Sequence, residues 1–377
     1  MKILIIGAGI CGLAIAKRLQ DTDFDVTIVD KEDAQQSISV GICLPANAVE
    51  GLRKLGLYPS LMSIAHQVST IEYAKANGET LAKASLLEPP FNKGEFVSVL
   101  RSDLMALISE TVTQKIHWGT SAQIRENNTD GVRVSFNQKE ESQLFDLVIA
   151  ADGIHSPTRE AIFPNSYAKK LGLSTWRFVV NNTRATPEPV YYLGNDETFV
   201  IYPLPNAKAY CYGHMPSSKV RTSSGQATAR EALLNAFKLY NREVLHKIHQ
   251  LSEDDTQVIR GELESVQLAN THSGRVVLIG DALHGCPPTL EQGVGMGLED
   301  IHTLTDLLSE NSIDETLILF EQQRLPRVKW VVEESNNIIR HAAKGSMLVG
   351  RFFRNSLIRR RGPANVVGWK KLLTESV

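Results

Sequence analysis

The sequence contains few cysteines, and they are not spaced as in disulfide or metal-binding motifs. Its 377 residues include four, at Cys11, Cys43, Cys211 and Cys286, with no CxxC arrangement. This pattern disfavours both a disulfide-held secreted domain and a cysteine-ligated zinc site, so we expect no metal. A reducing, cytoplasmic compartment fits the same pattern.

An excess of charge of one sign is also missing. Forty lysines and arginines stand against 42 aspartates and glutamates, which leaves a net charge of −2. No overall basic field is available to hold nucleic acid, so we expect no nucleic-acid partner. The 42% hydrophobic and 22% charged composition is that of a globular chain, and it excludes disorder or a coiled coil as a description of the whole.

Long hydrophobic runs are absent as well. Residues 3–16 carry no charge, but glycines interrupt them, and Lys17 and Arg18 continue a helical pattern where a signal-peptide cleavage site would stand. The longest other uncharged run, residues 55–71, is broken by Pro59. We therefore expect neither a secretory signal nor a membrane span.

A late basic segment is the exception to this even charge. Residues 351–361 hold five arginines and no acid, beside Phe352 and Phe353. The favoured interpretation is a solvated helix face. Weak association with a membrane surface is the alternative.

What the sequence does contain is concentrated in its first thirty residues. Residues 2–6 predict a buried strand, residues 13–20 a helix, and residues 24–30 a second strand that ends on Asp30. Between the first strand and the helix stands Gly7-x-Gly9-x-x-Gly12. Glycines at this spacing allow a tight turn, close approach of the backbone to a pyrophosphate, and close packing of helix on strand. With an acid placed for ribose hydroxyls, the unit predicts an FAD or NAD site.

Two later segments favour FAD over NAD. Residues 147–149 read as a buried strand leading into Asp152-Gly153, and residues 276–279 as another leading into Gly280-Asp281. A loop rich in proline and glycine follows, and a helix begins near Gly293. Ligands of open α/β sheets bind at the carboxyl ends of strands, where both acids stand.

The order of these segments predicts an interrupted organisation. A strand-rich middle separates the nucleotide motifs, so the expected fold class is α/β, with a Rossmann-like FAD-binding domain, an inserted β-sheet substrate domain and a helical C-terminal region. Further local expectations are helices over 46–55, 101–114 and 224–251, and a hairpin turn at 130–131. The expected boundaries are 1–67, 98–164 and 272–340 for the FAD-binding domain, 68–97 and 165–271 for the substrate domain, and 341–377 for the C-terminal helical extension.

Taken together, these segments resemble the class A flavoprotein monooxygenases, the family of para-hydroxybenzoate, salicylate and FAD-dependent urate hydroxylases. The resemblance includes the helix start at Arg101, the strand at Trp176-Arg177, and Phe320-Glu321-x-x-Arg324-x-x-Arg327. It implies hydroxylation of a small aromatic or heteroaromatic substrate with FAD, O2 and either NADH or NADPH, through a C4a-hydroperoxyflavin. A flavin-dependent epoxidase, oxidase or reductase, and a flavin-binding protein without turnover, remain alternatives on the same fold.

The resemblance also implies roles for individual residues. Asp30 would hold the adenosine ribose, Arg101 the pyrophosphate side, Asp281 a ribityl hydroxyl, and Asp152 the pyrophosphate through water. The N–H groups of Gly293 and its neighbour would face the flavin, where a helix N-terminus stabilises negative charge. The expected cofactor-binding set is Gly7, Gly9, Ile10, Cys11, Gly12, Asp30, Lys31, Arg101, Asp152, Gly280, Asp281, Gln292, Gly293 and Val294.

Some positions depart from the family pattern. Asp30 replaces the usual glutamate, and Gly295 replaces an asparagine. The loop usually written P-x-x-G-Q-G carries Glu291 in place of its first glycine, so a carboxylate either lies by the flavin or substrate or points to solvent.

The substrate side is less defined, because no catalytic base stands out. The pocket candidates are Arg177, Tyr202, His214 and Pro288, whereas His284 is expected to pack under its loop. Substrate identity, the choice of NADH or NADPH, and oligomeric state are not readable from the sequence.

Overall fold

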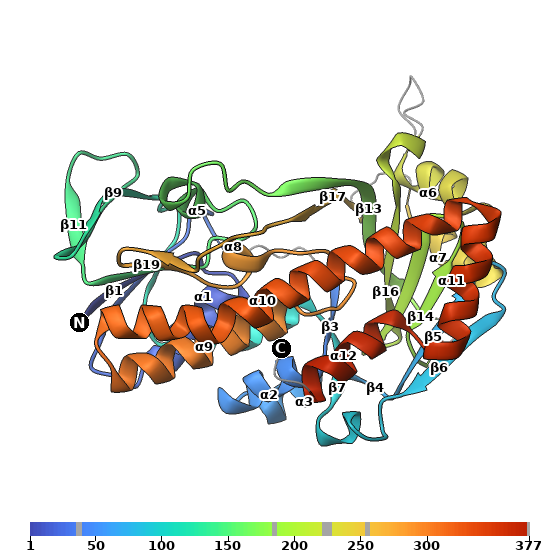
Figure 1. The fold of residues 1–377 in the computed structure, drawn as a ribbon, viewed down its shortest axis with the longest axis horizontal. Helices are drawn as coiled ribbons and strands as arrows, with labels where there is room; N and C mark the ends of the chain where they lie inside the picture. Colours follow the sequence, from blue (N-terminus) through green and yellow to red (C-terminus); the bar gives the residue numbers. More distant parts are fainter. Residues whose placement is uncertain (35–39, 183–186, 221–227, 253–256, 375–377) are drawn as a thin grey trace.

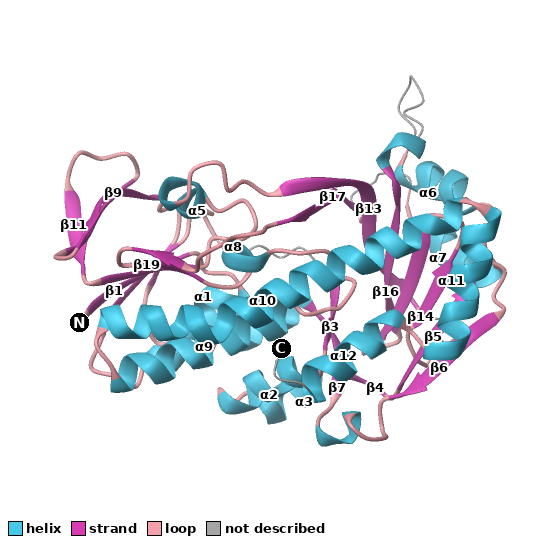
Figure 2. Cartoon of the chain, in the orientation of Figure 1, coloured by secondary structure: helices cyan, strands magenta, loops and turns pink. Residues whose placement is uncertain are grey.

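The computed structural model describes residues 1–374 apart from 35–39, 183–186, 221–227 and 253–256 (Figure 1). It is a mixed α/β fold in which a parallel sheet lies toward one end and a seven-stranded sheet toward the other (Figure 2). Helix α10 (Ile313–Ala343) runs along the molecule between these ends (Figure 1). The expected α/β class with a helical C-terminal region is confirmed.

The parallel sheet brings three chain segments to one edge. Its order is β18-β19-β12-β1-β2-β8, and every neighbouring pair is parallel except β18 with β19. Because parallel strands end at the same edge, Gly7, Asp152 and Gly280 follow neighbouring strand ends. The strands are β1 (Lys2–Ile6), β2 (Asp25–Val29), β8 (Ile116–His117), β12 (Leu147–Ala150), β18 (His272–Ser273) and β19 (Val276–Leu278).

Both faces of this sheet are covered, which suits strands that are apolar on both sides. Helix α1 (Ile10–Leu19) packs against α4 (Arg101–Ser109) and α9 (Gly293–Glu310), and α9 also packs against α2 (Ala46–Lys54). The opposite face carries an antiparallel sheet of β9 (Ala122–Asn128), β10 (Gly131–Phe136) and β11 (Ser142–Phe145). The expected hairpin turn joins β9 to β10.

Helix α4 is shorter than the sequence predicts, ending at Ser109 instead of residue 114. The hydroxyl of Thr111 donates a 2.7 Å hydrogen bond to the carbonyl oxygen of Ile108. This local bond competes with helical pairing just where β-branched residues already disfavour it.

The seven-stranded sheet has the order β17-β13-β16-β15-β14-β5-β6. The parallel pair of β14 with β5 joins residues 68–97 to residues 165–271 in one sheet, as expected. Helices α6 (Ala229–Phe237) and α7 (Arg242–His249) cover one face; residues 224–227 of the helix expected over 224–251 lie outside the described part. The strands are β5 (Thr70–Lys75), β6 (Thr80–Ser85), β13 (Lys169–Asn181), β14 (Val190–Leu193), β15 (Thr198–Leu204), β16 (Lys208–Pro216) and β17 (Ile259–Ser265).

A small antiparallel sheet between the larger ones was not expected. It consists of β3 (Gly41–Leu44), β7 (Phe96–Leu100) and β4 (His66–Val68), and it contacts β15 and β16. The proposed domain boundaries at 67/68 and 97/98 fall inside β4 and β7, which pair with each other. The division into domains stays a prediction, and this sheet is where its parts meet.

The C-terminal helices return to the seven-stranded sheet. Helices α11 (Leu348–Arg361) and α12 (Ala364–Thr374) lie at that end of the molecule (Figure 1). Trp369 of α12 is buried in the hydrophobic cluster of the sheet. Of the helices in the described ranges, none combines the length and hydropathy needed to cross a membrane. The remaining helices are α3 (Tyr58–Ile64), α5 (Pro157–Ile162) and α8 (Asp281–His284).

Candidate cofactor and substrate site

The three glycines of the motif, two before α1 and one in its first turn, meet different surroundings. A Cβ on Gly7 would lie 2.4 Å from the Ala151 carbonyl oxygen, and one on Gly12 would lie 1.8 Å from the Gly7 carbonyl oxygen. A Cβ on Gly9 would meet nothing within 4 Å. Gly7 and Gly12 are therefore required by the protein's own packing, whereas Gly9 leaves open space at the start of α1. The first N–H groups of that helix, beginning at Ile10, have no intrahelical acceptor and suit a phosphate.

Asp30, directly after β2, fixes this glycine loop. Its Oδ2 accepts a 2.6 Å hydrogen bond from the N–H of Ala8, and its Oδ1 accepts a 2.9 Å bond from the N–H of Glu32. A carboxylate has about four acceptor positions, so these bonds leave capacity for a ribose hydroxyl. Lys31 lies beside it, exposed to solvent.

Cys11 joins the two ends of the site by packing. A Cβ on Gly280 would lie 2.6 Å from its Sγ, and one on Gly297 of α9 would lie 2.4 Å from it. The sulfur thus fills the space that these two glycines leave. Burial raises the pKa of the thiol well above its ordinary value, which favours a packing role over a reactive one.

A cavity of about 280 Å³ lies along the edge of the parallel sheet. It is walled by the glycine loop, by residues after β2 and β12, and by the start of α4. Eight members of the expected cofactor-binding set are absent from its wall and lie around α8 and α9, or at the start of α1. Those present are Gly7, Gly9, Asp30, Lys31, Arg101 and Asp152.

Two carboxylates and one guanidinium set the electrostatics of this edge. Burial lowers the pKa of Arg101, and the carboxylate of Asp281 opposes that shift. Asp152 Oδ2 accepts a 3.2 Å bond from the N–H of Thr158, whereas its Oδ1 is buried with no hydrogen-bond partner in the described part of the chain. Burial raises the pKa of Asp152, so a partner for Oδ1 would stabilise its charged form.

The loop before α9 approaches the same edge. A Cβ on Gly293 would lie 3.7 Å from Asp281 Oδ1, so nothing in the protein requires a glycine there. The buried side chain of Gln292 accepts a 2.8 Å bond from the amide of Asn47. That same amide lies 2.7 Å from where a Cβ on Gly295 would stand. Asn47 therefore occupies the space beside Gly295, the position that is an asparagine in class A flavoprotein monooxygenases. Val294 follows in the first turn of α9.

His284, which was expected to pack under its loop, is buried in a polar network. Its Nε2 lies 2.6 Å from Asp300 Oδ2, which also accepts a 3.0 Å bond from the N–H of Gly280. Arg324 Nε donates a 2.8 Å bond to Asp300 Oδ1. Burial opposes ionisation of Asp300, but His284 and Arg324 outweigh it and lower its pKa. The network fixes the turn that presents Asp281.

Three predicted pocket residues share one face of the seven-stranded sheet. Arg177 is paired with Tyr212 across β13 and β16, His214 follows Tyr212 by two residues, and Tyr202 is on β15. Alternation along strands places them on the face opposite α6 and α7. The Tyr212 hydroxyl and His214 Nδ1 are buried without a described hydrogen-bond partner, and burial lowers the His214 pKa to about 4. The fourth candidate, Pro288, is exposed.

Glu291 reaches this face from the loop before α9. Its Oε1 accepts hydrogen bonds from the hydroxyls of Tyr202, at 2.6 Å, and Tyr191. The amide of Asn365, on α12, donates a 3.1 Å bond to the Tyr191 hydroxyl. The carboxylate does not point to solvent. Tyr191 and Asn365 were missed: period-two alternation could have selected Tyr191, but nothing local marks Asn365.

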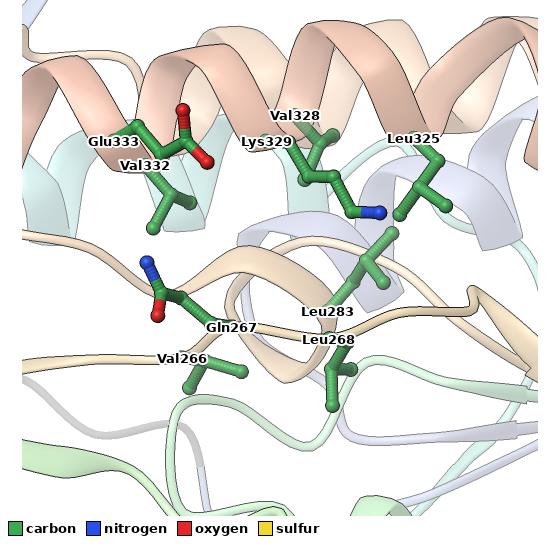
Figure 3. A pocket seen from close by; sticks show the side chains of 9 residues that line it. All are labelled: Val266, Gln267, Leu268, Leu283, Leu325, Val328, Lys329, Val332 and Glu333. Carbon is green, nitrogen blue, oxygen red and sulfur yellow. The ribbon is translucent and has the colours of Figure 1, made fainter.

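Another cavity, of about 210 Å³, lies beneath α10 and away from these residues (Figure 3). Leu325, Val328 and Lys329 of α10 face Leu283 and Leu268 across it. None of the sequence-predicted site residues lines it, so we do not assign it to a cofactor.

The residues along the sheet edge fit a dinucleotide. Open space at Gly9, the unpartnered Oδ1 of Asp152 and two helix N-termini, of α1 and α9, lie along one edge. The family model described as FAD binding domain matches residues 1–335. The chain belongs to the FAD-binding domain family. This match confirms FAD as the cofactor, and relatives named as monooxygenases confirm the resemblance to that group.

Two relatives and one solved structure show how far the similarity extends. The 3-amino-4-hydroxybenzoate 2-monooxygenase of Streptomyces cremeus is 29% identical over 339 residues, covering 87% of this chain and 84% of that protein. The 2-heptyl-3-hydroxy-4(1H)-quinolone synthase of Pseudomonas aeruginosa is 28% identical over 340 residues, covering 89% and 88%. Klebsiella pneumoniae HpxO, solved with FAD and uric acid, shares the fold with a TM-score of 0.87 at 22% identity, covering 100% and 97%.

Proposed function

We propose that this FAD-binding protein is a monooxygenase that uses NADH or NADPH and O2 to hydroxylate a small aromatic or heteroaromatic substrate. The observation that carries the proposal is one loop, residues 288–295, which follows Asp281 at the FAD edge and extends to buried polar atoms on the seven-stranded sheet. The relatives named above, which act on an aminohydroxybenzoate and form a hydroxyquinolone, support the substrate class.

Distinct groups of this chain would hold the cofactor. The open backbone at Gly9 and the first N–H groups of α1 would receive the pyrophosphate, with Arg101 supplying positive charge. Asp30 would bind the adenosine ribose, and Asp281 a ribityl hydroxyl. The N–H groups of Gly293 and Val294, at the start of α9, would stabilise negative charge on the ring.

When bound, FAD accepts hydride from the nicotinamide and activates O2 for transfer of one oxygen atom. The chain's part is to orient the substrate and exclude water. Trp369 supports that exclusion, because its Nε1 donates a 2.7 Å bond to the carbonyl of Leu290 and holds α12 against the loop. His214, whose pKa is about 4, is neutral near pH 7 and contributes a hydrogen bond, not a charge.

The test is to purify the protein, release its nucleotide by heat, and measure NADH and NADPH oxidation with and without aromatic compounds. We expect FAD, oxidation stimulated by a subset of these compounds, and products one oxygen atom heavier by mass spectrometry. Stimulated oxidation that yields only hydrogen peroxide would indicate an oxidase instead.

We also propose that α11 contacts an anionic membrane surface. Phe352 and Phe353 are 71% and 66% exposed, and Leu348 one turn earlier is 78% exposed. Arg360 and Arg361 are exposed on the same helix, and their charge is complementary to anionic lipid. Co-sedimentation with phosphatidylglycerol vesicles should be lost in Phe352→Asp. A dimer that dissociates in that variant, without vesicle binding, would assign the face to a second copy.

We propose a cytoplasmic location on a separate ground. The four cysteines are all unpaired, as a reducing compartment favours.

A further inference from the structure

Glu291 stands where the backbone itself disfavours it. Its φ is +51°, in the left-handed region that glycine adopts without strain. Two residues later α9 begins at Gly293, which lies beside Asp281, so Glu291 stands just before that helix start. A glutamate at such a position carries backbone strain that a glycine would avoid. We take this strain as a sign that the carboxyl group has a function.

The surroundings of the carboxyl group are asymmetric. Oε1 accepts bonds from both Tyr191 and Tyr202, and the Tyr191 hydroxyl is in turn held by the amide of Asn365. Oε2 is buried and has no described hydrogen-bond partner. The paired strands β14 and β15, together with the distant helix α12, thus fix one oxygen and leave the other without a donor from the described part of the chain.

The electrostatics leave this group able to exchange a proton near neutrality. Burial raises the pKa of Glu291 to about 7, and the hydroxyls of Tyr191 and Tyr202 and the amide of Asn365 oppose the shift. None of these three neighbours is a cation. The other titratable groups that face the carboxyl are Tyr73 of β5, Cys43 of β3 and Tyr210 of β16, and burial raises the pKa of each, so they stay neutral.

The chemistry of a matching ligand follows from these contacts. An unpartnered carboxylate oxygen accepts N–H or O–H donors and repels a second carboxylate. The Tyr73 and Tyr191 rings lie 4.8 Å apart between centroids, beside Phe96 and Trp369, whose centroids are 5.0 Å apart. These four rings belong to one buried hydrophobic cluster, and a flat aromatic ring packs against such a cluster better than a polar chain does.

We propose that Oε2 of Glu291 binds an ionisable O–H or N–H group on the substrate ring and accepts its proton. The inference deepens the proposed function, on which it rests, by naming the substrate class: a neutral aromatic or heteroaromatic ring with a hydroxyl or ring N–H. In the transfer the substrate O–H or N–H bond breaks, an Oε2–H bond forms, and the electron pair stays on the substrate heteroatom. That pair delocalises into the ring, and the ring carbons become more nucleophilic toward the transferred oxygen atom.

The test measures binding to the FAD-loaded protein without NADH or NADPH. The probes are matched pairs, each a phenol or hydroxypyridine that stays neutral at pH 8 with its O-methyl ether. For at least one pair we expect the hydroxyl compound to bind about tenfold more tightly than the ether near pH 8, since Glu291 is then ionised. The preference should decline toward about pH 6 as the carboxylate is protonated.

The decisive variants change the carboxyl group in two ways. Glu291→Gln keeps the shape and should reduce the preference to about twofold or less. Glu291→Gly suits the backbone at this position and should do the same with FAD still bound. Glu310→Gln, which removes an exposed carboxylate at the far end of α9, should leave the preference unchanged.

An unchanged preference in both Glu291 variants would overturn the inference. Two results with the unaltered protein would also overturn it: equal binding of hydroxyl compounds and ethers, or no binding of any pair. Because no turnover is measured, a Glu291-dependent preference in a protein that never oxidises NADH or NADPH would contradict the proposed function and leave the recognition by Glu291 standing.

Discussion

Glu291 makes stability depend on pH at the scale of one residue. Its pKa rises from an ordinary 4.5 to about 7 on folding, so the folded chain binds the proton more tightly than the unfolded chain does. The associated stability is fully present below about pH 4.5 and is lost as the pH rises through about 7. Above that window the buried carboxylate is a net cost to the fold.

We therefore expect Glu291→Gln to stabilise the FAD-free protein near pH 8 by on the order of 1–3 kcal/mol, and to have little effect near pH 5. Urea unfolding at both pH values measures the difference. Glu310→Gln serves as the exposed control. A Gln variant that is less stable at both pH values would mean that the carboxylate is held by contacts stronger than those described.

The glycines of the first loop separate packing from ligand access. A Cβ at position 9 meets only open space, whereas one at position 12 would overlap the Gly7 carbonyl oxygen. We expect Gly9→Ala to fold normally and to bind FAD at least about tenfold more weakly, and Gly12→Ala to lose about 2 kcal/mol or more of stability. Fluorescence titration with FAD and thermal melting of the FAD-free variants distinguish the two outcomes. Full FAD affinity in Gly9→Ala would place the pyrophosphate elsewhere.

At the scale of elements, α8, α9 and α10 depend on one another through Asp300. Its two oxygens serve His284, the Gly280 N–H and Arg324, all buried. Asp300→Asn should cost about 3 kcal/mol, because it removes the carboxylate that faces the buried Arg324 guanidinium. Asp306→Asn, on the same helix but with an exposed side chain paired with Arg18, should cost no more than about 0.5 kcal/mol. Equal effects in denaturant melts would show that the network is not structural.

Elements set by local pattern were predictable from the sequence, and those set by distant pairing were not. The strand, glycine turn and helix at residues 2–19 follow from periodicity and turn chemistry within twenty residues. In the small sheet, Gly41 of β3 pairs with Leu100 of β7, and His66 of β4 pairs with Ser98 of β7. None of these strands carries a local signal for its distant partner. The end of α4 was missed because a threonine side chain competes with helical pairing.

The same distinction holds within the site. Asp30 and Asp281 are recognisable because each follows a buried strand, and that local context places them at the sheet edge. The contacts of Glu291 with Tyr191 and Asn365 join positions 100 and 74 residues apart, which no motif spans. The sequence identified Glu291 as unusual, and only the fold could show where its carboxyl group lies.

At the scale of the whole molecule, FAD would link segments from Gly7 to Gly293. A ligand that binds only the folded chain adds about 2.7 kcal/mol to its stability at a concentration of 100 times Kd. We expect that increase for the unaltered protein and a clearly smaller one for Asp281→Ala at the same FAD concentration. Melting temperatures across an FAD series measure both. Identical shifts for the two proteins would remove Asp281 from the cofactor site.

Helix α12 also has a consequence for how the protein is made. Asn365 and Trp369, which secure Tyr191 and Leu290, are synthesised more than 300 residues after the glycine loop. On the ribosome, the nucleotide-binding edge can therefore form while the aromatic cluster around Tyr191 still lacks Trp369. A nascent chain stalled before Ala364 should already retain FAD, yet it should not discriminate between a phenol and its methyl ether. Cofactor loading and substrate recognition would thus be acquired in that order during a single round of translation.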